Sequence, residues 1–128
     1  MEKVKEFEDL EVFQRGALCK EVYQITSIAP LANDFRFVQQ IRAASGSIMD
    51  NIAEGFERNG NKEYLNFLYI AKDSAGEVRS QLLRAYDASF ISKGDYEQLY
   101  ADVKDIGRML FHLIQSIKQK GNPGSKYQ

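Results

Sequence analysis

Cysteine, proline, histidine and tryptophan are scarce in this sequence. Its 128 residues contain one cysteine, two prolines, one histidine and no tryptophan. Cys19 alone cannot form an intramolecular disulfide, which favours a reducing compartment. No proline lies between Pro30 and Pro123, so no proline ring interrupts helices in that stretch.

The net charge is also small, and the apolar runs are short. The formal net charge is −1, so any binding of nucleic acid must depend on a local basic patch. The apolar runs are only a few residues long, too short to span a bilayer, and residues 1–13 are charged where a signal peptide has its apolar core. We therefore expect a cytoplasmic protein with no membrane partner.

Apolar residues recur every three or four positions in four segments, which breaks at residues 29–34, 58–61 and 89–95 separate. The first two stripes are Leu10, Phe13, Ala17, Leu18, Val22 and Ile25, then Val38, Ile41, Ser45, Ile48, Ile52 and Phe56. The last two are Tyr64, Phe67, Ala71, Ala75, Val78, Leu82 and Ala85, then Tyr96, Leu99, Val103, Ile106, Leu110, Leu113 and Ile117. No comparable stretch alternates with a period of two.

These stripes predict an all-α protein, an antiparallel up-down-up-down four-helix bundle formed by residues 1–120. Residues 121–128 have no periodicity and are expected to form a flexible C-terminal tail.

Further apolar residues lie beside the main stripes of the third and fourth segments. A monomeric bundle needs one apolar stripe per helix, and a wider one has to be covered. The surplus predicts a homo-oligomer, unless the loops, the N-terminal arm and the tyrosine hydroxyls cover this surface. The candidate interface residues are Tyr69, Ile70, Tyr100, Phe111 and Ile114.

The second segment also carries a polar stripe. Helical spacing places its members on one face, with Arg42 at its edge and with Ser74 and Glu77 on the following helix. The stripe consists of Ser47, Asn51, Glu54 and Arg58. We interpret the whole set as a structural network that fixes helix register or a subunit contact. The alternative is that Glu54 and Glu77 act as acid and base, or as metal ligands.

The sequence lacks the residue motifs of the common catalytic and metal-binding sites. A di-iron bundle needs Glu-x-x-His on two helices, but the residue three before His112 is Met109. Cys19 has only a distant histidine as a base, and no Gly-x-Ser-x-Gly occurs. We expect no enzyme activity, no metal and no cofactor.

Four glycines fall inside the expected helices: Gly16, Gly46, Gly76 and Gly107. A glycine in a helix costs about 1 kcal/mol relative to alanine. Close helix approach would explain them, and simple tolerance is the alternative.

Basic residues would gather at one end of the bundle, where the second and fourth helices end and the third begins. They are Arg58, Lys62, Lys118 and Lys120. The patch could bind RNA or an acidic partner, although cations in a last helical turn also simply complement the helix dipole, and Glu57 and Glu63 lie nearby.

Residues 40–58, QIRAASGSIMDNIAEGFER, resemble the 23S rRNA-intervening-sequence protein family. The resemblance continues in EYLNFL at 63–68 and AKDSAGE at 71–77, and it includes FEDLEVF at 7–13 and the leucines and isoleucine of 109–114. Ala43 stands where the family usually has a second arginine, which removes a positive charge, and Met49 where it usually has proline.

The resemblance implies a small bacterial four-helix bundle. Relatives include the accessory protein of diversity-generating retroelements, a pentamer with a basic surface that works with a reverse transcriptase and nucleic acid. By resemblance we expect a non-enzymatic homo-oligomer, a pentamer, that binds RNA or a nucleic-acid-binding protein. The alternative is a protein–protein adaptor or scaffold that binds no nucleic acid.

Overall fold

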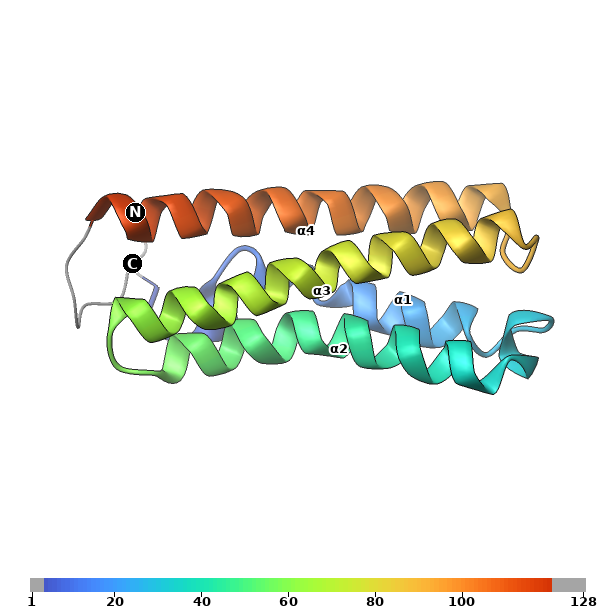
Figure 1. Cartoon of the computed structure of the whole chain (residues 1–128), viewed down its shortest axis with the longest axis horizontal. Helices are drawn as coiled ribbons and strands as arrows, with labels where there is room; N and C mark the ends of the chain where they lie inside the picture. The colour runs from blue at the N-terminus through green and yellow to red at the C-terminus, as the bar shows by residue number, and fades with distance from the viewer. Residues whose placement is uncertain (1–3, 121–128) are drawn as a thin grey trace.

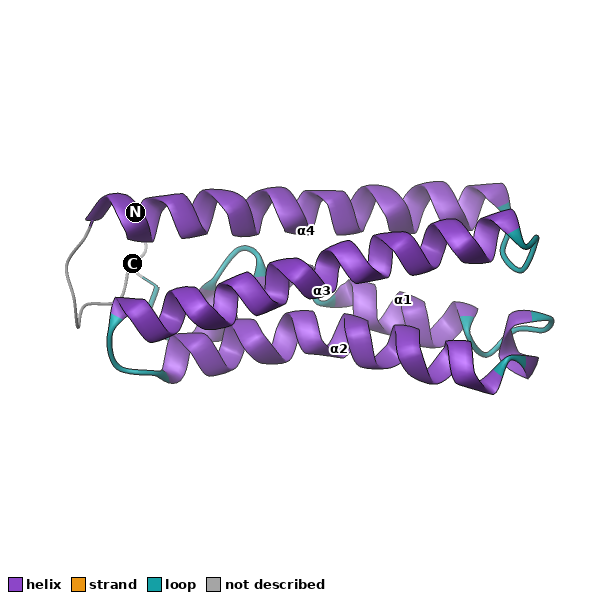
Figure 2. Cartoon of the chain, viewed as in Figure 1, coloured by secondary structure: helices purple, strands orange, loops and turns teal. Residues whose placement is uncertain are grey.

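The computed structural model describes residues 4–120, which form helices and no strand. The helices are α1 (Ala17–Ile25), α2 (Phe35–Glu57), α3 (Asn61–Asp87) and α4 (Lys93–Lys120), with 3-10 turns at Phe7–Asp9, Phe13–Arg15 and Leu31–Asn33. Figure 2 shows that only short loops connect α2, α3 and α4. None of these helices is long and apolar enough to cross a membrane. The tail predicted at 121–128 lies outside the described residues.

The three long helices run antiparallel, with α3 packed between α2 and α4 (Figure 1). The short α1 packs on α2 and α4, and the 3-10 turns before it continue the fourth side of the bundle. The all-α four-helix bundle predicted from the sequence is therefore confirmed.

The first helix is much shorter than its predicted stripe. Leu10 and Val12 are both buried, and residues two apart point to opposite sides of an α-helix. Two 3-10 turns allow both side chains to reach the core, and α1 begins only at Ala17.

The ends of the long helices have local causes. The Asp34 carboxylate accepts a hydrogen bond from the Phe37 backbone at 3.1 Å, which caps α2. Gly60, with φ of 97°, separates α2 from α3. The Ser92 hydroxyl accepts from the Asp95 backbone at 3.1 Å at the start of α4.

The predicted stripes of α2, α3 and α4 form the core. Phe67, Tyr96 and Leu113 are only partly buried, whereas Leu68 and Ile114 join the core. Ile114 is 3% exposed, so its assignment to an oligomer surface was wrong. It follows Leu110 by four residues and precedes Ile117 by three, so all three share the inward face.

Candidate functional site

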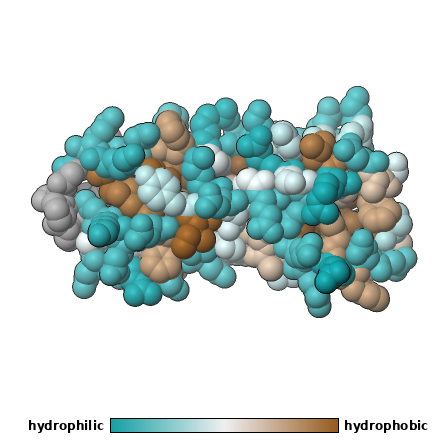
Figure 3. Space-filling view, in the orientation of Figure 1, coloured by the Kyte–Doolittle hydropathy of each residue, from teal (hydrophilic) through white to brown (hydrophobic). Residues whose placement is uncertain are grey.

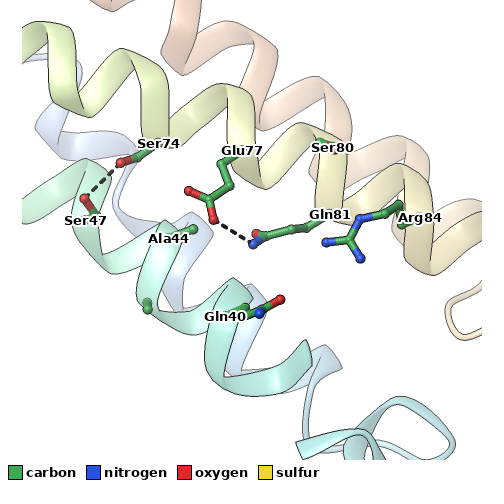
Figure 4. A pocket seen from close by; sticks show the side chains of 9 residues that line it. Gln40, Ala44, Ser47, Ser74, Glu77, Ser80, Gln81 and Arg84 are labelled. Atoms are coloured by element: carbon green, nitrogen blue, oxygen red, sulfur yellow. Dashed lines mark hydrogen bonds between the residues drawn. The ribbon is translucent and has the colours of Figure 1, made fainter. Parts of the chain in front are cut away.

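A polar network joins α2 to α3 near the middle of both helices. The Ser47 and Ser74 hydroxyl oxygens lie 2.9 Å apart (Figure 4). The Asn51 side-chain amide donates to the Ser47 carbonyl at 2.8 Å and to its hydroxyl at 2.9 Å. The structure therefore brings together three residues of the predicted network, and their hydrogen bonds connect α2 to α3.

A groove of about 440 Å³ continues from this network along the outside of α2 and α3. Figure 4 shows the Glu77, Gln81 and Arg84 side chains extending over it from α3. Gln81 donates through its side-chain amide to a Glu77 carboxylate oxygen at 3.2 Å. The groove is lined by Gln40, Ala43, Ala44, Ser47, Ser74, Glu77, Ser80, Gln81 and Arg84.

Glu54 and Glu77 do not meet. The contact between Ser47 and Ser74 places Glu54, seven residues further along α2, level with Phe67 on the antiparallel α3. Phe67 and Glu77 are ten residues apart, which is about 15 Å along a helix. Glu54 instead accepts from the Arg58 guanidinium at 3.3 Å. Within residues 4–120 no cluster of three potential metal ligands occurs.

Arg42 does not join the network predicted for it. Its Nε donates to the Thr26 hydroxyl at 2.9 Å and an Nη to the Ser27 hydroxyl at 3.4 Å, while the guanidinium carbon lies 4.7 Å from the Tyr23 ring centroid. Arg42 points toward α1, because it lies on the other side of α2 from Ser47. Its role is to attach the C-terminal end of α1 to α2.

The predicted basic residues lie at one end of the bundle, where α2 and α4 end and α3 begins (Figure 1). Lys62, Lys118 and Lys120 are exposed. Arg58 is paired with Glu54 and lies 5.1 Å from the Phe67 ring centroid. The arginine is therefore held against the bundle by neighbouring side chains, and the lysines are the more accessible charges.

Apolar and aromatic side chains lie on the surface formed by α3 and α4, which we call the α3/α4 face. Tyr69, Leu83 and Phe111 are 41%, 43% and 46% exposed. Figure 3 shows hydrophobic side chains gathered on this side of the molecule, in the half near the α2–α3 loop. Ile70 is also exposed, but it precedes Ser74 by one turn and so lies on the α2 side of α3.

The two helices of this face are aligned by aromatic contacts. Tyr86 and Tyr96 stack with centroids 4.5 Å apart, and an Nη of Arg79 donates to the Tyr100 hydroxyl at 3.3 Å. This hydrogen bond and the guanidinium charge lower the pKa of Tyr100.

The antiparallel alignment of α3 and α4 that these aromatic contacts give also places Gly76 opposite Gly107. Gly76 is seven residues from both Tyr69 and Leu83, and Gly107 is seven from Tyr100, so both share the exposed stripe. Within the described chain, a Cβ on either glycine would meet no atom of another element within 4 Å. The α3/α4 face is therefore open at these two glycines, and Tyr69 and Leu83 lie seven residues to either side of Gly76.

The sequence pattern did not lead us to two residues whose packing the structure shows to be important. Gln81 has a polar side chain that is only 2% exposed, although its spacing of seven from Ser74 could have placed it on the polar stripe. Gly55 packs against α3, where a Cβ would come 2.7 Å from the Phe67 Cβ. No local signal distinguishes this glycine from the other helical ones.

Comparison with known proteins agrees with the fold. The model of the 23S rRNA-intervening sequence protein family matches residues 8–112. A solved structure from Bacteroides thetaiotaomicron VPI-5482, described as a protein of unknown function from the S23 ribosomal protein family, superimposes with a TM-score of 0.74. The two chains are 23% identical, and the match covers 81% of this chain and 95% of that one. No curated protein matches. The family match spans most of the sequence, and the chain belongs to the 23S rRNA-intervening sequence protein family.

Proposed function

We propose that this protein is a non-enzymatic assembly protein whose copies associate through the α3/α4 face. The observation that carries the proposal is the pair of open glycines, Gly76 and Gly107. Each costs its helix about 1 kcal/mol relative to alanine, and neither makes room for another element of the same described chain. A second copy packed at that point would use the space.

The side chains around the glycines fit a helix as the occupant. Tyr69, Gly76 and Leu83 recur every seven residues on α3, which is the spacing that keeps one face toward a partner helix. Small residues at the centre let two backbones approach closely, and apolar residues on either side supply buried area. Closed homo-oligomers are the commonest assemblies of soluble proteins, and the resemblance to the retroelement accessory protein makes five the expected number of subunits.

Sedimentation velocity of a variant with a side chain at Gly76 tests the proposal. Gly76→Gln places a flexible polar side chain in the centre of the face, and Gly46→Gln is the matched control, since Gly46 is also an open glycine inside a helix but lies on α2. We expect Gly76→Gln to shift the protein toward the 14.6 kDa monomer and Gly46→Gln to sediment as the wild type. Equal sedimentation of all three proteins would contradict the α3/α4 interface.

RNA binding at the basic end is the second candidate function. It is supported by the exposure of Lys62, Lys118 and Lys120 at one end of the bundle. The net charge of −1 limits this attraction in one copy, but an assembly repeats the patch and so multiplies a weak contact. If no RNA binds, the assembly acts as a protein–protein scaffold.

A further inference from the structure

The α3/α4 face carries basic residues around its open glycines. Arg79 donates to the Tyr100 hydroxyl of α4 at 3.3 Å, and Lys72 precedes Arg79 by seven residues, so both cations lie on the α4 side of α3. Lys104 follows Tyr100 by four residues and precedes Gly107 by three, which places it on the same face. All three cations are exposed, and none of them forms an ion pair within residues 4–120. Two copies that met through this face alone would therefore bring like charges together.

The other flank of α4 carries two neighbouring carboxylates. There α4 packs on α1, and we call this surface the α1/α4 face. The Gln98 side-chain amide of α4 donates to a Glu21 carboxylate oxygen of α1 at 3.2 Å, and burial together with the charge of Asp102 raises the pKa of Glu21. Neither carboxylate forms an ion pair in the described part of the chain, whereas Asp105 pairs with Arg15. A cation from another molecule would therefore be stabilised beside Glu21 and Asp102.

An apolar groove of about 400 Å³ lies on the same α1/α4 face, between α4 and the N-terminal 3-10 turns. Met109 lines this groove, and a thioether packs favourably beside an aromatic ring. Phe111 lies on the α3/α4 face and is 46% exposed, so α4 has an exposed aromatic ring on one flank and an apolar groove on the other. The groove is lined by Leu10, Glu11, Val12, Met109, His112 and Leu113.

The two faces match in height along α4. Lys104 lies two residues from Asp102, which is about 3 Å along the helix axis. Phe111 lies midway between Met109 and Leu113 of the groove. A rotation about an axis parallel to the helices leaves the height of every residue unchanged. One such rotation would therefore bring Lys104 to the carboxylates of the next copy and Phe111 to its groove at the same time.

We propose that the α1/α4 face is the docking surface for the α3/α4 face of a second copy. Phe111 of one copy enters the apolar groove of the next, and Lys104 pairs with the carboxylates of Glu21 and Asp102. This inference rests on the proposed association through the α3/α4 face and supplies its complementary surface. Because α3 and α1 both pack on α4 (Figure 1), the two faces are adjacent sides of the bundle. Successive head-to-tail contacts therefore turn in one direction and close a small ring.

Charge reversal in the full chain tests this contact by sedimentation velocity. The acid-reversed variant is Glu21→Lys with Asp102→Lys, and the base-reversed variant is Lys72→Glu with Lys104→Glu. Each should raise the dissociation constant of the assembly about tenfold or more, because like charges then face each other. Combining all four substitutions in one chain should restore the assembly, since opposite charges face each other again. This rescue also shows that neither pair acts by unfolding the protein.

A photoreactive residue tests the groove separately. Replacing Phe111 with benzoylphenylalanine and irradiating the assembly should join two chains, with the cross-link at Met109 or at residues 10–12 of the second chain. A cross-link to Tyr69 or to position 111 of the second chain would show that two α3/α4 faces meet each other, which overturns the proposal.

The outcomes separate this contact from the α3/α4 interface itself. The matched control is Asp50→Lys with Glu57→Lys, two exposed acids of α2, and it should sediment as the wild type. If the acid-reversed variant sediments as the wild type while Gly76→Gln dissociates, the α1/α4 face is refuted and the α3/α4 interface stands. If the control dissociates as far as the acid-reversed variant, the effect is one of overall charge and the contact is refuted. A monomeric wild type refutes both proposals.

Discussion

Gly55 of α2 lies directly against Phe67 of α3, so closely that a Cβ on the glycine would come 2.7 Å from the Cβ of the phenylalanine. The same added atom would lie 3.2 Å from a ring carbon of Tyr64. The Phe67 Cβ is attached to the backbone, so a change of rotamer cannot move it away. The open glycines Gly76 and Gly107 have no such neighbour in the described chain. Glycines inside the helices of this protein therefore have different surroundings.

Gly55→Ala should destabilise the fold even though alanine is the better helix former. Overpacking a well-packed contact costs about 1–3 kcal/mol, which exceeds the gain of about 1 kcal/mol in helix propensity. Urea denaturation measures the change in the free energy of unfolding. Gly46→Ala is the control, because open space surrounds that Cβ position, and it should leave stability unchanged or raise it. A stabilised Gly55→Ala variant would contradict the close packing of α2 on α3.

Tyr64→Phe should stabilise the protein. The Tyr64 hydroxyl is buried and has no hydrogen-bond partner among residues 4–120, and an unsatisfied buried polar group costs about 1–3 kcal/mol. We expect a gain of about 1 kcal/mol in the free energy of unfolding at pH 7, measured by urea denaturation. A loss of stability would show that the hydroxyl has a partner that matters.

The gain from Tyr64→Phe should grow in alkali. Burial raises the pKa of Tyr64 above its ordinary value. In the unfolded chain tyrosine ionises near pH 10, so above that pH the unfolded state releases a proton that the folded state retains. Below pH ~10 the phenol is protonated in both states, so its ionisation does not change the free energy of unfolding of the wild type. As the pH rises further, that free energy falls. The difference between variant and wild type should therefore be larger at pH 10.5 than at pH 7.

Arg42→Ala should loosen α1 from α2. The substitution removes the donor to the buried Thr26 hydroxyl and the contact with the Tyr23 ring, and we expect a loss of about 1–2 kcal/mol. Arg42→Lys should recover only part of it, because an ammonium lacks the planar fork that stacks and donates together. Arg36→Ala, an exposed arginine in the first turn of α2, should change stability by less than about 0.5 kcal/mol.

Removing two exposed lysines should reduce the salt dependence of RNA binding. The slope of log affinity against log salt is negative. For the double variant Lys62→Ala with Lys118→Ala, its magnitude should decrease by about 2, roughly 1 for each lost phosphate contact. A labelled RNA hairpin in filter binding supplies the measurement. The control removes Arg36 and Lys93, which lie in the first turns of α2 and α4 at the opposite end of the bundle. Binding that is absent even at low salt would favour the protein scaffold.

Helical periodicity was sufficient to predict α2, α3 and α4 and most of their core residues, because long amphipathic helices leave a regular pattern. The buried Ser45 illustrates this: its position on the stripe was correct, and its hydroxyl donates to the Arg42 carbonyl one turn earlier, at 3.2 Å. The short α1 was not predictable in the same way, since Leu10 and Val12 both reach the core only because the chain leaves the α-helix there.

Contacts between helices limited the prediction of the candidate site. Spacing on one helix was enough to group Ser47 with Asn51, and the antiparallel order brought Ser74 to them. The partners of Arg42 depend on where α1 ends, and the meaning of each glycine depends on what packs against it. The local sequence pattern predicts neither the partners of Arg42 nor the residues that pack against each glycine.

Sedimentation equilibrium of the wild-type protein shows whether the chain self-associates. If copies associate through the α3/α4 face as proposed, we expect one assembly several times heavier than the 14.6 kDa chain across a wide range of concentrations. A species that stays at 14.6 kDa even at the highest concentration would contradict self-association through Gly76 and Gly107.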